Sequence, residues 1–137
     1  MHLVSRVSEW NKSQIDKRSN NLISATLVIL VSVIHFAIAT VEMFFWRLPK
    51  VHSRLGFDTE GANKVAPIVA NAGLYNSFIA CGLIFGLSSW GSPSMILFFL
   101  TCVIVAGIYG ALTLKPTTLV LQSIPGAIAW VAVWLSK

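Results

Sequence analysis

One apolar stretch constrains this chain more than any other feature of its sequence. Between Leu22 and Trp46 only two side chains are ionisable, His35 and Glu42. A helix needs about 20 predominantly apolar residues to cross the hydrocarbon core of a bilayer, and this stretch is longer than that. It also lacks the polar alternation of a barrel strand. The stretch therefore predicts a membrane-spanning helix that carries two ionisable groups.

The rest of the composition indicates more segments of the same kind. Of the 137 residues, 55% are hydrophobic and only 11% are charged, whereas a soluble domain has about 25% charged residues. We predict an all-α fold, an antiparallel bundle of four transmembrane helices in a multi-pass protein of the cell membrane. The four spans are expected at about residues 22–46, 67–87, 94–114 and 118–135.

The polar segments predict where the spans begin and turn. Residues 1–21 form a polar N-terminal segment, which suits a short interfacial helix and a frayed tail equally, and residues 22–137 form the four-span membrane domain. Candidate N-caps for the first span lie in residues 19–21. Residues 47–66 are expected to be the one substantial loop, with Pro67 in the first turn of the second span.

The net charge of +5 does not indicate a nucleic-acid partner. The basic residues flank the apolar spans, where they would meet lipid headgroups, and no stretch resembles a nucleic-acid-binding module. With four spans, both termini lie on one side of the membrane. The positive residues then divide evenly between the two sides, so the positive-inside rule does not decide the orientation.

The first candidate site lies within the first span. Helical positions seven apart differ by about 20° in direction and about 10 Å in height, so His35 and Glu42 share a face that Trp46 continues one turn later. Ionisable groups within a membrane are costly and are functional suspects. One interpretation is an acid–base or proton-relay pair, and the other is a pair of polar groups that hydrogen-bond to neighbouring helices.

A second polar cluster begins the second span. Asn71 and Tyr75 are four apart and share a helical face, while Asn76 points elsewhere. Gln122 begins the fourth span on the same side of the membrane as residues 47–66, so the sequence predicts a polar pocket that opens toward that loop. We predict His35 and Glu42 as the acid–base pair, and as ligand-binding residues Asn71, Tyr75, Asn76, Gln122 and Trp46.

Other chemistry-bearing residues have plainer interpretations. Cys81 and Cys102 fall within predicted spans without metal-ligand spacing, so we expect them to be small packing residues. His2 and His52 lie in polar segments and are expected at the solvated surface. The sequence has no Gly-rich phosphate loop and too few ligands for a metal site. We therefore expect neither a metal nor a cofactor.

Four short motifs together resemble a known family. They are the H-x6-E-x3-W pattern from His35 to Trp46, then Asn71-x-Gly73-x-Tyr75-Asn76, Gly107-x-Tyr109-Gly110 and Gln122-x2-Pro125. Across roughly residues 22–135 the chain resembles the small bacterial integral membrane family catalogued as domain of unknown function 1304. Ala72 stands where the family pattern has glutamine. The resemblance implies a four-span bundle and membrane residence, and it implies no established activity.

Three functions remain open at this point. The first is a protein that binds or processes a lipid-like or small apolar molecule at the polar cluster. The second is a proton-coupled transport component, which would need a homodimer; the Gly82-x3-Gly86 face is available for it, although packing within one chain is the favoured use. The third is an assembly protein without chemistry. The bilayer is the expected partner in all three.

Overall fold

Every regular element of the structure is helical. The computed structural model describes residues 2–137, is 88% helical and contains no strand within those residues. The elements are α1 (His2–Thr40), the π-helix η1 (Val41–Phe45), α2 (Pro49–His52), the 3-10 helix η2 (Ser53–Leu55), α3 (Thr59–Leu87), α4 (Pro93–Thr113), the π-helix η3 (Leu119–Ser123) and α5 (Ile124–Ser136).

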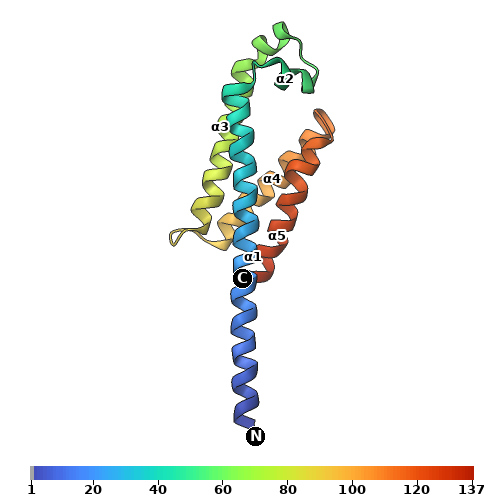
Figure 1. Cartoon of the computed structure of the whole chain (residues 1–137). Helices are drawn as coiled ribbons and strands as arrows, with labels where there is room; N and C mark the ends of the chain where they lie inside the picture. The colour runs from blue at the N-terminus through green and yellow to red at the C-terminus, as the bar shows by residue number, and fades with distance from the viewer. Residues whose placement is uncertain (1) are drawn as a thin grey trace.

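Four helical segments are long and apolar enough to cross a membrane: Trp10–Phe45, Thr59–Leu87, Pro93–Thr113 and Leu119–Ser136. Helix α1 packs against α3 and α5, and α4 packs against the same two helices, so the four close into an antiparallel bundle (Figure 1). The predicted all-α, four-helix fold is confirmed. Lys115 donates a hydrogen bond to the backbone oxygen of Arg54, which places the α4–η3 turn at the same end of the bundle as α2 and η2.

The bundle core draws aliphatic side chains from every long helix, including Val31, Leu83, Leu100 and Val133. Glycine lets α3 and α4 approach closely. A Cβ atom on Gly82 would lie 2.3 Å from Cζ of Phe99, and one on Gly86 would lie 2.6 Å from Cγ1 of Ile96. These two glycines are therefore used for packing within one chain, which was the favoured of their two predicted uses.

The predicted start of the first helix is wrong. Helix α1 runs from His2 to Thr40 without a break, so residues 19–21 do not cap it. No glycine or proline interrupts residues 2–40, and nothing else in that stretch forces the chain out of the helical conformation. Figure 1 shows the consequence, because α1 continues well past the ends of the other helices.

The predicted start of the second long helix is also wrong. Helix α3 begins at Thr59 rather than Pro67, with Asp58 as its N-cap: Oδ1 of Asp58 accepts a hydrogen bond of 2.8 Å from the backbone nitrogen of Gly61. Pro67 therefore lies inside the helix. The expected loop of residues 47–66 is largely folded, because α2, η2 and the first turns of α3 occupy it.

A small cluster of side chains, the cap cluster, holds this folded segment on the bundle. Its members are Trp46, His52, Phe57 and Ala62. The indole nitrogen of Trp46 donates a 2.8 Å hydrogen bond to the backbone oxygen of Ala62, and its ring meets that of Phe57 edge-on at 5.5 Å. This packing ties the segment after η1 to the first turns of α3.

Two expectations for reactive side chains are corrected. His52 was expected in solvent but is only 3% exposed, because Trp46 and Phe57 enclose it and its Nδ1 donates to the backbone oxygen of Phe57 at 2.9 Å. Cys81 was expected to be a small packing residue but is exposed on α3, while Cys102 is partly buried. The side chain of His2 lies outside the residues whose side chains the structure describes.

Candidate functional site

Two π-helical segments hold two of the polar residues that the sequence singles out. Glu42 lies in η1 and Gln122 lies in η3. A π-helical turn is wider than an α-helical turn and is frequently found at functional sites. Both segments lie toward the end of the bundle that carries α2 and η2 (Figure 1). Pro125 lies just after η3, and its ring would clash with the carbonyl of Leu121 in a regular α-helix, whereas the sequence offers no such signal for η1.

The centre of the site is a hydrogen bond between η1 and α3. Nδ2 of Asn76 donates to Oε2 of Glu42 at 2.8 Å, and both side chains are partly buried. Gly73, one turn earlier on α3, allows this approach. A Cβ atom there would lie 2.7 Å from Cγ of Met43 and 3.0 Å from the backbone oxygen of Ala39. Glycine at this position thus lets the backbones of α1 and α3 come close enough for the bond.

The predicted orientation of the second cluster is wrong. Asn76, expected to point elsewhere, meets Glu42, while Asn71 and Tyr75 are exposed. The ring of Tyr75 is 61% exposed and contacts that of Phe78 edge-on at 6.0 Å. The face of α3 that meets α1 is set by small residues at intervals of seven, Ala66, Gly73 and Ala80, all buried. Asn76 lies between the last two on that face.

His35 is the deepest polar side chain of the predicted pair. It is 2% exposed, and its Nδ1 donates a 2.9 Å hydrogen bond to the backbone oxygen of Val31, which leaves the lone pair on Nε2 in the neutral ring. Ser32 beside it donates to the backbone oxygen of Val28 at 2.9 Å. This hydrogen bond of His35 thus stays within its own helix. His35 therefore does not join α1 to a neighbouring helix in the described part of the chain.

His35 and Glu42 do not form a direct pair. Within residues 2–137 no hydrogen bond joins them, and each has a different partner. Seven helical residues separate them by about 10 Å along the axis. Proton exchange between them would therefore need a group in between.

Gln122 lies at a close contact between η3 and α4. A Cβ atom on Gly107 would lie 2.9 Å from Cβ of Gln122 and 2.3 Å from Oγ of Ser123. The hydroxyl of Ser123 donates to the backbone oxygen of Ile104 at 2.9 Å, and that of Thr118 to the backbone oxygen of Gly107 at 3.2 Å. The motif that contains Gly107 thus contacts the motif that contains Gln122. The absence of a side chain at Gly107 explains how closely α4 and η3 approach.

Trp46 belongs to the cap cluster and does not extend the helix face that carries Glu42. It is 4% exposed, and its only polar group is already bonded to Ala62. Among the side chains that the structure describes, no group of three or more His, Cys, Asp or Glu residues lies together as a metal site would need. The structure thus brings Glu42 and Asn76 together and leaves His35, Gln122 and Trp46 with separate contacts.

These features define a class: an all-α protein with four membrane-length helices and a polar hydrogen bond between the first two. The chain belongs to the family described as "Protein of unknown function (DUF1304)", which matches residues 29–134. The match includes Glu42, Asn76 and both π-helical segments, and it confirms the resemblance seen in the sequence. No curated protein and no solved structure matches the chain.

Proposed function

We propose that this protein is a multi-pass protein of the cell membrane that binds a lipid-like amphiphile beside Glu42. The observation that carries the proposal is the Asn76–Glu42 hydrogen bond, which holds a partly exposed carboxyl group at the surface of an apolar helix pair. Only Oε2 of that carboxyl group has a protein donor in the described part of the chain. Oε1 is thus available to a ligand.

The surroundings of Glu42 favour a ligand with a long apolar body. Its neighbours on η1 expose large apolar side chains: Met43 is 38% exposed and Phe44 72%. A carboxylate bordered by such side chains favours an amphiphile whose head group donates hydrogen bonds, because its lone pairs accept them. An amine or hydroxyl head group meets this requirement.

The depth of Glu42 supports the same class of ligand. The residue lies one turn before Trp46, near the end of the span, so a head group bound there would stay close to interfacial water. The apolar body would then extend along α1 and α3 toward the membrane centre. We favour binding over proton transfer because His35 and Glu42 have separate hydrogen-bond partners.

The proposal is tested with two amphiphiles that share a tail and differ in head group, oleylamine and oleic acid. Native mass spectrometry of the purified chain in detergent measures their binding. We expect oleylamine to bind more tightly than oleic acid to the wild type, and Glu42→Gln to lower oleylamine binding about tenfold or more, as loss of a charge-assisted hydrogen bond would.

Glu60→Gln is the matched control, because Glu60 is exposed in the first turn of α3 and its removal changes the net charge equally. This variant is expected to bind oleylamine as the wild type does. Unfolding of Glu42→Gln, seen as a loss of thermal stability, would show that the carboxyl group is structural. Unchanged oleylamine binding in a folded Glu42→Gln would likewise reject the proposal.

A further inference from the structure

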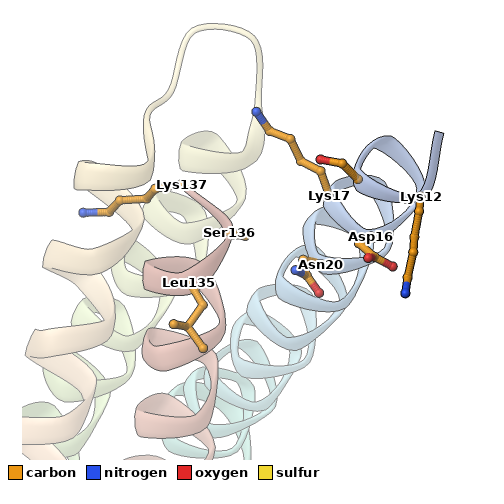
Figure 2. Close-up of a pocket in the computed structure, with 8 residues that line it drawn as sticks. Lys12, Asp16, Lys17, Asn20, Leu135, Ser136 and Lys137 are labelled. Atoms are coloured by element: carbon orange, nitrogen blue, oxygen red, sulfur yellow. The ribbon is translucent and has the colours of Figure 1, made fainter. Parts of the chain in front are cut away.

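A groove lies at the opposite end of the bundle from Glu42. One wall is a face of α1 that carries Lys12, Asp16, Lys17 and Asn20, and the other wall is the end of α5 with Ser136 and Lys137 (Figure 2). The groove is open to solvent and has a volume of about 560 Å³. It shares no residue with the proposed amphiphile site.

The groove exists because α1 is longer than its neighbour. Within the bundle, α1 packs against α5 as far as Ser24, whose hydroxyl oxygen accepts a 3.2 Å hydrogen bond from Ser136. Helix α5 ends there, whereas α1 continues toward its N-terminus. Lys17, Asn20 and Ser24 recur at helical spacing, so one face of α1 extends beyond α5 and becomes polar.

The groove is positively charged. Three lysines and one aspartate line it, so its side chains carry a net charge of +2, and Asn20 and Ser136 add neutral hydrogen-bonding groups. Lysine is a common phosphate-binding residue that acts as a point charge. An anion that also carries hydroxyl groups would suit both the lysine ammonium groups and the carboxylate of Asp16.

Aromatic side chains close to the groove support a location at the depth of lipid headgroups. Trp130 and Trp134 stack with ring centroids 5.4 Å apart, and Nζ of Lys137 lies 3.9 Å from the centre of the Trp134 ring. Tryptophan is enriched where membrane and water meet. The long apolar run of α1 begins at Leu22, directly after Asn20 and Asn21. The groove thus lies just outside the predicted hydrocarbon region.

We propose that this groove is a phosphate-binding site for the headgroup of an anionic phospholipid. Lys12 and Lys17 contact the phosphate, and Asp16 accepts hydrogen bonds from headgroup hydroxyls. A free phosphate ion offers part of the same chemistry, without the hydroxyl groups that Asp16 would bind. The assignment is independent of the amphiphile site, because the two sites lie at opposite ends of the bundle.

The test measures lipid binding to the purified full chain by native mass spectrometry. The probes are phosphatidylglycerol and phosphatidylcholine with identical acyl chains. We expect the wild type to prefer phosphatidylglycerol. Replacing both lysines in Lys12→Gln/Lys17→Gln should reduce that preference about thirty-fold, which is the expected effect of two lysines near an anionic surface. Both side chains are exposed, so the variant should fold normally.

The matched control is Lys50→Gln/Lys64→Gln, which removes two exposed lysines from the other end of the bundle. It should keep the wild-type preference. An equal loss in both double variants would attribute binding to net charge and overturn the proposal, as would a wild type without preference. Inorganic phosphate is added separately. If it binds the wild type but not Lys12→Gln/Lys17→Gln, and phosphatidylglycerol shows no preference, the site takes free phosphate and the lipid assignment is overturned.

Discussion

Asn76 and Glu42 are 34 positions apart in the sequence and are joined by a 2.8 Å hydrogen bond from Nδ2 to Oε2. The bond crosses from α3 to the π-helical segment that ends the first long helix. It orients a carboxyl group that would otherwise rotate freely at an apolar surface. The proposed amphiphile site depends on this orientation, and several predictions concern the residues that produce it.

Gly73→Val should weaken the contact between α1 and α3. The added side chain would overlap Cγ of Met43 and the backbone oxygen of Ala39, which lie 2.7 and 3.0 Å from the position of its Cβ atom. We expect the free energy of unfolding to fall by about 1–3 kcal/mol, the usual cost of overpacking, and oleylamine binding to fall as well. Unfolding of the detergent-solubilised protein by sodium dodecyl sulfate measures the first effect.

The control for this variant is Ala72→Val, which adds similar bulk at the neighbouring exposed position. It should have little effect on stability. If both variants lose the same stability, the cost comes from valine on helix α3 in general. The close approach at Gly73 would then not explain the Glu42–Asn76 bond.

How far the sequence predicts the fold depends on which interactions are local. The four long helices follow from apolar runs that need no knowledge of neighbours, and they are confirmed. Their starting points do not follow in this way. Pro67 is a familiar first-turn residue, but Asp58 caps α3 earlier and the helix tolerates the proline within it.

The site is less predictable, because it depends on which faces of the helices meet. Asn71 and Tyr75 form the more conspicuous polar pair, but the buried repeat of Ala66, Gly73 and Ala80 turns Asn76 toward α1. That repeat is present in the sequence and would have identified Asn76. The burial of His52 has no such local signal, because the residues that enclose it come from both sides of it in the chain.

Trp46→Phe should destabilise the cap cluster. The change removes the hydrogen bond to the backbone oxygen of Ala62 and keeps an aromatic ring beside Phe57. Loss of one buried hydrogen bond should lower the free energy of unfolding by about 1–3 kcal/mol. Thermal unfolding followed by circular dichroism measures it. Trp90→Phe serves for comparison, since Trp90 is 85% exposed, and its midpoint should match the wild type.

Gly107→Ala should destabilise the protein more than Gly110→Ala. The first change affects the contact of α4 with η3, and the second affects the turn that precedes η3. The new methyl group at position 107 would lie 2.3 Å from Oγ of Ser123 and 2.8 Å from its backbone nitrogen, whereas at position 110 the nearest atom is 3.1 Å away. We expect a cost of about 1–3 kcal/mol for Gly107→Ala and less for Gly110→Ala, because overpacking depends on how far neighbours must move. The reverse order in thermal stability would contradict the packing described for η3.

The most direct test of the account is a double-mutant cycle on oleylamine binding with Glu42→Gln and Asn76→Ala. If Asn76 acts by orienting the carboxyl group, Asn76→Ala should weaken binding in the wild type and have almost no effect in Glu42→Gln. The coupling should be about 0.5–3 kcal/mol, as expected for residues in contact. Independent, additive effects of the two substitutions, or no effect of either one on binding, would contradict the account.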